Sequence, residues 1–146
     1  MTFHEGYELK EFNRIYRGME EIYHKIALNI GISDSAFIIL YNILELGDGC
    51  LQKDICNMSF ISKQTVSSSI HKLENQGLLY LKAGKGREMQ IFLTETGKQF
   101  VNEKIQPVVA VENSIFQELS PEECRELLRL NEKYLTCFRE KSKLLF

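Results

Sequence analysis

Side chains that can form hydrogen bonds gather on one side of a predicted helix that follows Ser62. Val66, Ile70 and Leu73 recur at helical spacing, so they form a narrow apolar stripe on this segment. The opposite face carries Gln64, Ser67, Ser68, His71, Lys72 and Asn75. Donors and acceptors with a net positive bias match what base edges offer in the major groove of DNA. The alternative interpretation is an ordinary solvated helix surface.

A basic, glycine-containing loop follows this helix and separates two runs with high strand propensity, residues 78–82 and 89–93. This arrangement predicts a β-hairpin. The tip of the hairpin contains Lys85 and Arg87 and only one acid, Glu88. A cationic tip beside a polar helix can reach the phosphate backbone or enter the minor groove, where arginine is favoured.

Positive charge is concentrated on these two predicted elements. Residues 62–87 carry five cationic side chains and one acidic side chain, a net charge of +4. The whole chain carries -2, so the remaining residues carry -6. A basic surface on an otherwise acidic chain directs a polyanion to one face. The charge distribution therefore favours nucleic acid as a partner.

Predicted helices on both sides position this module. Apolar residues at three-four spacing predict a long helix over residues 5–30, and a helix that is apolar nearly all round follows a Ser33 cap. A short helix over residues 51–58, a tight turn and the polar-faced helix form a helix-turn-helix pattern. The amphipathic long helix predicts burial of part of its apolar face by a partner chain, the alternative being burial within its own domain.

The C-terminal part of the chain also reads as helical. Thr94 can cap a helix in which Pro107 must produce a kink or a break, because proline removes a hydrogen bond and clashes with the preceding turn. Ser120, Pro121 and Glu123 form a strong start signal for a last helix with an apolar stripe. The chain thus begins and ends with amphipathic helices.

Composition limits the class of protein. A chain of 146 residues with 44% hydrophobic and 26% charged residues can bury the core of one domain. No apolar run approaches the ~20 residues that span a bilayer, and no signal peptide is recognisable. We therefore expect a cytoplasmic protein without membrane contact, whose four cysteines are reduced.

The chain resembles the MarR family of bacterial winged helix-turn-helix regulators. The resemblance is carried by Ile-Ser-Lys-Gln-Thr-Val-Ser at residues 61–67, Leu-Glu-Asn-Gln-Gly-Leu-Leu at 73–79, and Leu-Thr-x-x-Gly at 93–97. It implies a mainly α fold with a small antiparallel β-hairpin wing, in a single MarR-type domain over residues 1–146. The winged helix-turn-helix module would occupy residues 33–94, and dimerisation helices would occupy 5–30 and 95–146.

The resemblance also implies a function. It implies a homodimer that places two recognition helices in successive major grooves of a pseudo-palindromic operator in double-stranded DNA. The expected activity is transcriptional regulation, most often repression that a small-molecule effector relieves. The DNA-contacting residues would be Ser62, Lys63, Gln64, Thr65, Ser67, Ser68, His71 and Lys72 on the helix and Lys82, Lys85 and Arg87 on the wing. Arg87 matches the family's wing arginine, whereas Lys85 stands where the family usually has an acidic residue.

The sequence offers weaker candidates for an effector pocket and a redox site than for DNA contact. Tyr16, Tyr23, Phe37 and Tyr41 could line an effector pocket, or they could be ordinary core residues. Cys50, in a predicted turn, is the candidate for a redox-sensing thiol, since Cys56, Cys124 and Cys137 read as packed residues. The three histidines lack metal-binding spacing, so we expect no metal and no cofactor. No nucleophile-base constellation indicates an enzyme. The alternatives to an effector-controlled repressor are a thiol-based redox regulator and a winged-helix module for protein-protein contact.

Overall fold

The computed structural model describes all residues from Met1 to Phe146 and divides into two units, Met1–Ile105 and Gln106–Phe146. The first unit contains α1 (Tyr7–Ile30), α2 (Asp34–Leu46), β1 (Cys50–Leu51), α3 (Gln52–Ser59), α4 (Lys63–Asn75), β2 (Leu79–Ala83), β3 (Met89–Leu93), α5 (Glu95–Phe100) and the π-helix η1 (Val101–Ile105). The second unit contains α6 (Gln106–Glu118), α7 (Pro121–Ser142) and the short 3-10 helix η2 (Lys143–Leu145).

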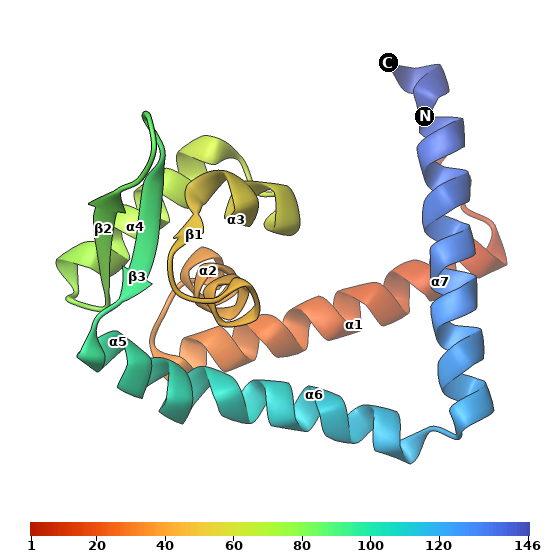
Figure 1. Cartoon of the computed structure of the whole chain (residues 1–146). Helices are drawn as coiled ribbons and strands as arrows, with labels where there is room; N and C mark the ends of the chain where they lie inside the picture. The colour runs from red at the N-terminus through yellow and green to blue at the C-terminus, as the bar shows by residue number, and fades with distance from the viewer. The chain divides into compact units, whose positions relative to one another are not determined.

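Helix α2 is the centre of the hydrophobic core in the first unit. It packs against α1, α3, α4 and η1, and the central position of α2 is visible in Figure 1. Ile39, Leu40 and Ile43 of α2 are at most 1% exposed. Burial of each such side chain contributes about 1.5–3 kcal/mol, so these residues provide much of the stability of the unit. The predicted all-round apolar helix is therefore confirmed.

Helix α4 has the boundaries and the buried face that its sequence predicts. The Oγ atom of Ser62 accepts a hydrogen bond from the backbone N–H of Thr65 at 3.2 Å, which caps the first turn. Val66, Ile70 and Leu73 are at most 2% exposed. The apolar stripe thus packs inward and leaves the polar face outside.

The turn between α3 and α4 contains a backbone conformation that is unusual for its residue. Phe60 ends α3 with a φ angle of 56°, the only positive φ value outside glycine, and its side chain is 87% exposed. The backbone N–H of Phe60 donates to the carbonyl oxygen of Cys56 at 3.1 Å. This bond closes the last turn of α3, and the left-handed conformation of Phe60 ends the helix. The chain then turns into α4, so the two helices form the expected helix-turn-helix arrangement.

The wing is part of a three-stranded antiparallel sheet with the order β1-β3-β2. Strands β2 and β3 are the predicted hairpin, and they lie side by side in Figure 1. The third strand was not predicted, because Leu51 was assigned to the short helix. Strand β1 is two residues long and is defined by the pairing of Cys50 with Ile91 and of Leu51 with Gln90. A strand this short has no alternation that a sequence could reveal.

Pro107 lies where the type of helix changes. The α-helical hydrogen-bond pattern of α5 ends at Phe100 and is replaced by the π-helix η1, after which α6 begins at Gln106. Pro107 is therefore the second residue of α6. Proline is tolerated near a helix start, and a π-helical segment accommodates the change in hydrogen bonding upstream. No residue separates η1 from α6, so the predicted break is absent and the helix changes its hydrogen-bond type instead.

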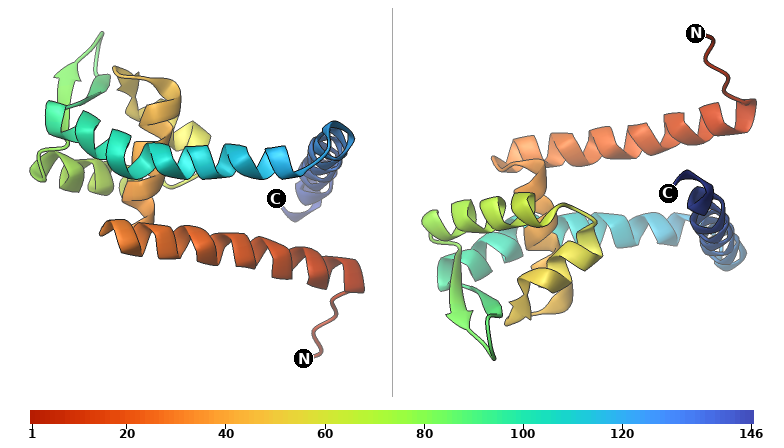
Figure 2. Two further views of the ribbon diagram at one scale, coloured as in Figure 1. Left: turned by 90° about the horizontal axis from the view of Figure 1, so that it is seen from below. Right: turned by 90° about the horizontal axis from the view of Figure 1, so that it is seen from above.

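Helix α1 buries very little of its surface within its own unit. Ala27 is its only buried residue, and the N-terminal part of α1 projects away from the other elements of the unit (Figure 2). An exposed apolar row follows one side of α1: Phe12, Ile15, Tyr16, Met19, Ile22 and Tyr23.

No single helix is long and apolar enough to cross a bilayer; only α1 and α2 combined reach that composition, and they are bent by 92°.

The second unit also presents uncovered apolar residues. Helix α7 begins at the predicted capping box, in which Ser120 Oγ accepts from Glu123 N at 3.1 Å and Glu123 Oε1 accepts from Ser120 N at 2.9 Å. None of its residues is buried. Its exposed apolar side chains are Leu127, Leu128, Leu130, Tyr134, Leu135 and Phe138. Both units therefore have an apolar helix face that the folded chain leaves open.

Candidate nucleic-acid interface

The outer face of α4 is open along its length. The side chains predicted to contact DNA from this helix and its cap are all exposed: Ser62, Lys63, Gln64, Thr65, Ser67, Ser68, His71 and Lys72. The serines place no long side chain in front of the helix axis. A ligand as wide as a DNA duplex can therefore approach the helix closely, and an α-helix fits the major groove.

The wing presents cations next to this helix. Lys82, Lys85 and Arg87 are exposed, as predicted. The tip is closed by a hydrogen bond from Gly84 N to the carbonyl oxygen of Glu88 at 2.9 Å. The rings of Tyr80 and Phe92 stack across the two strands with centroids 5.2 Å apart, which stabilises the hairpin behind its tip.

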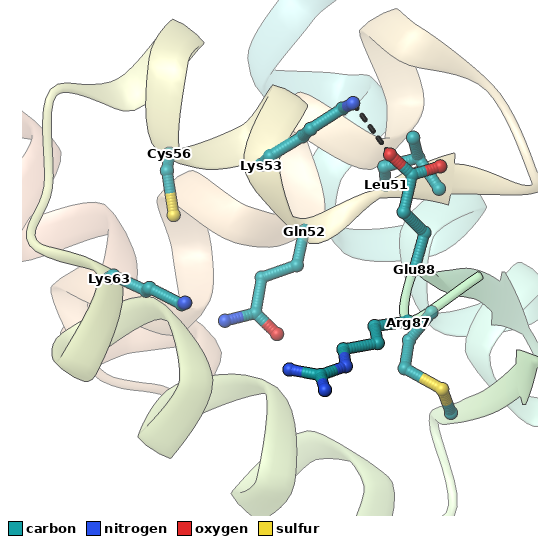
Figure 3. A pocket seen from close by; sticks show the side chains of 8 residues that line it. Leu51, Gln52, Lys53, Cys56, Lys63, Arg87 and Glu88 are labelled. Atoms are coloured by element: carbon teal, nitrogen blue, oxygen red, sulfur yellow. Dashed lines mark hydrogen bonds and ion pairs between the residues drawn. The ribbon is translucent and has the colours of Figure 1, made fainter.

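A hollow of about 340 Å³ separates the wing from the start of α4. Its walls come from β1, α3, the first residue of α4 and the wing: Leu51, Gln52, Lys53, Cys56, Lys63, Arg87, Glu88 and Met89. Figure 3 shows the side chains of Gln52, Lys63 and Arg87 pointing into the space between these elements. Three cations and one carboxylate line the hollow, so it is suited to a negatively charged group such as a phosphate of the DNA backbone.

An ion pair joins the wing to α3 at the edge of this hollow. The Nζ atom of Lys53 donates to Oε1 of Glu88 at 2.7 Å, and the bond is drawn in Figure 3. The hydrogen bond and the charge of Glu88 raise the pKa of Lys53 above its ordinary value. The single carboxylate of the wing tip thus bonds to a lysine of α3, and Lys85 replaces the acidic partner that the family resemblance implies for Arg87.

Sequence reasoning did not identify Gln52 and Lys53 as site residues. Both lie on the first helix of the helix-turn-helix, where the sequence shows no polar stripe. They reach the wing only because β1 pairs with β3 and brings the start of α3 beside Glu88. The sequence shows that Lys53 is charged, but Lys53 and Glu88 are 35 residues apart, so no sequence pattern predicts their ion pair.

The four residues proposed for an effector pocket do not form one group. Phe37 of α2 contacts Tyr23 of α1 and Tyr41, with ring centroids 6.1 Å and 6.0 Å apart. Tyr16 instead stacks on Phe12 of the same helix at 6.4 Å. Phe37 is 4% exposed and is a core residue, whereas Tyr16 is 53% exposed. Three of the four residues thus form an aromatic cluster between α1 and α2.

The expectations for the cysteines need correction. Cys50 lies on strand β1 and not in a turn, and it is half-buried. Burial, together with the charges of Asp54 and Asp48, raises the pKa of its thiol to about 11. The reactive thiolate is therefore disfavoured at Cys50. Cys56 is half-buried and lines the hollow instead of lying in the core, and Cys137 is the exposed cysteine.

Comparison with known families agrees with this geometry. The family model described as the MarR family matches residues 30–87, which include α2, the helix-turn-helix and the wing as far as Arg87. This segment is similar to the MarR family. The resemblance inferred from the sequence is thus confirmed for the helix-turn-helix and most of the wing. A search of curated proteins finds no significant match to the chain.

Solved structures extend the MarR likeness to nearly the whole chain. A MarR family regulator from Neisseria meningitidis aligns with a TM-score of 0.82 at 20% identity, over 97% of this chain and 100% of that one. MepR of Staphylococcus aureus, in a complex with DNA, aligns with a TM-score of 0.73 at 23% identity, over 92% and 99%. AbsC, a MarR family transcriptional regulator from Streptomyces coelicolor, aligns with a TM-score of 0.73 at 22% identity, over 95% and 99%. The chain has the winged helix fold of MarR regulators.

Proposed function

We propose that this protein is a sequence-specific, double-stranded DNA-binding transcriptional regulator. The observation that carries the proposal is the juxtaposition of the exposed polar face of α4 with a cationic wing and a cation-lined hollow. This is the positive surface of a chain that is acidic elsewhere. The similarity to MepR, whose structure contains DNA, supports the same assignment. In this proposal α4 reads base edges and the wing contacts the backbone.

The proposed active form is a homodimer. Helices α1 and α7 each leave an apolar face uncovered within their own unit, and contiguous exposed apolar surfaces mark interaction sites. A second copy of the chain supplies a self-complementary cover in a two-fold dimer. Residues 1–146 would then act as one MarR-type domain, and the two α4 helices would contact half-sites about 10 bp apart in a pseudo-palindromic operator.

The finer proposal is a cytoplasmic repressor that a small molecule releases from DNA. It is supported by the MarR family match and by the aromatic cluster of Tyr23, Phe37 and Tyr41. Tyrosine hydroxyls beside aromatic rings suit a ligand with both apolar and polar parts. The cluster lies between α1 and α2, so a ligand inserted there would act on the contact between the proposed dimerisation helix and the core of the DNA-binding module.

The experiment that tests DNA binding begins with selection of bound fragments from genomic DNA. Affinity for the selected operator is then measured at several salt concentrations for the parent and for Arg87→Ala. We expect weaker binding and a salt slope lower by about 0.9, because one phosphate contact is lost. Arg14→Ala, which removes an exposed arginine from α1, is the matched control and should bind like the parent. A parent chain that selects no fragment contradicts the proposed function.

A further inference from the structure

We propose that Lys53 is a positioning residue for DNA binding: through its ion pair with Glu88 it fixes the wing to α3, so that Arg87 faces the start of α4. The inference rests on the proposed function and adds a residue on the first helix of the helix-turn-helix to it. It is carried by the 2.7 Å bond between Lys53 Nζ and Glu88 Oε1, which links side chains 35 residues apart in sequence.

The backbone around the ion pair explains why this bond controls the wing. Leu51, two residues before Lys53, pairs with Gln90, two residues after Glu88. The ladder between β1 and β3 ends there, since β1 is only two residues long. Beyond this point the Lys53–Glu88 bond is the next connection between α3 and the wing. Without it, the wing tip would keep its own hairpin bonds and the packing between α3 and β3, but no ion pair would join it to α3.

Arg87 is placed by this connection because it precedes Glu88 in the chain. Figure 3 shows the two side chains leaving the wing in different directions, Glu88 toward Lys53 and Arg87 into the hollow beside Gln52 and Lys63. No ion pair or hydrogen bond of Arg87 itself fixes its guanidinium group. The direction of Arg87 therefore depends on the backbone at Glu88, and a freely rotating tip would offer its cation to DNA in many orientations. Fixing the tip reduces the entropy lost when the guanidinium binds a phosphate.

A direct contact of Lys53 with a DNA phosphate is the competing explanation. Lys53 is 62% exposed at its side chain, so solvent and salt weaken the ion pair. The two explanations differ in their salt dependence. A lysine that neutralises a phosphate contributes about 0.9 to the salt slope, whereas a lysine that only holds the wing changes the slope by much less, through the screening of its ion pair. They also differ in whether the exchange of the two charges restores binding.

The test uses the full-length protein, the selected operator and three variants, Lys53→Met, Glu88→Gln and the charge exchange Lys53→Glu with Glu88→Lys. We expect Lys53→Met to weaken binding about threefold, the size of effect that an exposed ion pair produces, and to change the salt slope by much less than the ~0.9 of a lost phosphate contact. The charge exchange should restore affinity to within about twofold of the parent, since it keeps the total charge and the pair. Lys25→Met, which breaks a similar pair with Glu21 at 2.8 Å on α1, is the control and should bind like the parent.

Hydrogen exchange of the backbone amides at the wing tip supplies the readout that a purely electrostatic role would not change. The Gly84 amide, which donates to the carbonyl oxygen of Glu88 at 2.9 Å, should exchange faster in Lys53→Met and in Glu88→Gln and at the parent rate in the charge exchange. Equal melting temperatures would show that all variants fold. A salt slope lower by about 0.9 for Lys53→Met, no rescue by the charge exchange, or unchanged exchange of the Gly84 amide would overturn the inference while DNA binding by the parent stands. A parent that binds no DNA fragment would overturn the proposed function and this inference together.

Discussion

A methyl group at Gly97 would overlap the carbonyl oxygen of Leu78. An ideal Cβ atom built on Gly97 lies within 2.9 Å of the carbonyl carbon of Leu78 and closer still to its oxygen. The same oxygen accepts a hydrogen bond from Thr94 N at 3.1 Å, and Thr94 Oγ1 donates to the carbonyl oxygen of Gly77 at 2.6 Å. The Leu-Thr-x-x-Gly sequence at the end of the wing therefore holds the start of α5 against the chain that leaves α4.

Substitution of Gly97 by alanine should destabilise the first unit. Because the obstructing atoms are backbone atoms fixed by hydrogen bonds, relief requires α5 to move, and we expect a loss of about 1–3 kcal/mol in the free energy of unfolding. Urea denaturation measures this loss. Gly6→Ala is the control, since its Cβ would meet only a glutamate side-chain oxygen at 3.9 Å, and it should lose less than about 1 kcal/mol. Equal stabilities of the two variants would contradict the close packing of Gly97 against the backbone of Leu78.

Gln64 and Lys72 should affect DNA recognition in different ways. Gln64 is exposed in the first turn of α4, the part of a recognition helix that contacts base edges, so Gln64→Ala should relax preference at one operator position by about 1–3 kcal/mol. Lys72→Ala should weaken binding to all sequences and lower the salt slope by about 0.9. Affinities for operators with every base pair at each position separate these effects. A uniform loss for Gln64→Ala would contradict its role as a base reader.

Cys50 should be unreactive in the folded protein near neutral pH. With a pKa of about 11, only roughly one thiol in a thousand is ionised at pH 8. In a variant that retains Cys50 as its only cysteine, alkylation by iodoacetamide should be slow at pH 8 and rise about tenfold per pH unit toward pH 10. The same variant in denaturant, where the thiol has its ordinary pKa, is the control. Rapid alkylation of the folded protein at pH 8 would contradict the burial of this thiol.

The raised pKa of Cys50 also has a consequence for stability. The folded state holds the proton more tightly than the unfolded chain, so the thiol contributes its full stabilisation below the ordinary thiol pKa of about 8.5. This contribution is lost as pH rises from there toward about 11. Comparison of the parent with Cys50→Ala should show a difference in unfolding free energy that shrinks over this pH range.

A charge on the apolar face of α1 should dissociate the proposed dimer. Ile22 is 58% exposed within the folded chain and belongs to the apolar row of α1, so Ile22→Glu should raise the dimer dissociation constant by at least tenfold. Leu28→Glu is the matched control, because Leu28 is 64% exposed but lies outside the three-four spacing of that row. Analytical ultracentrifugation measures the association, and circular dichroism checks the fold. Equal dissociation constants for the two variants would place the dimer contact elsewhere.

The amino-acid sequence by itself determined the local elements that form the candidate site. Ser62 as a cap, the buried stripe of Val66, Ile70 and Leu73, and the hairpin around the basic tip all depend on interactions over a few residues. Such interactions leave a period or a start signal in the sequence. Because α4 has one apolar stripe, its polar face had to lie outside, and the exposure of the residues proposed to contact DNA followed from that.

Only the tertiary structure decided which distant residues meet. Strand β1 exists because Cys50 pairs with Ile91, and that pairing buries a thiol expected in an open turn. The same pairing brings Lys53 to Glu88 and forms the hollow into which Arg87 points. These contacts join segments separated by 35 or more residues, and each involves too few residues to produce a period. Their partners are fixed by the packing of α3 and α4 around α2 and of the wing against α3 and α4, which no single segment encodes.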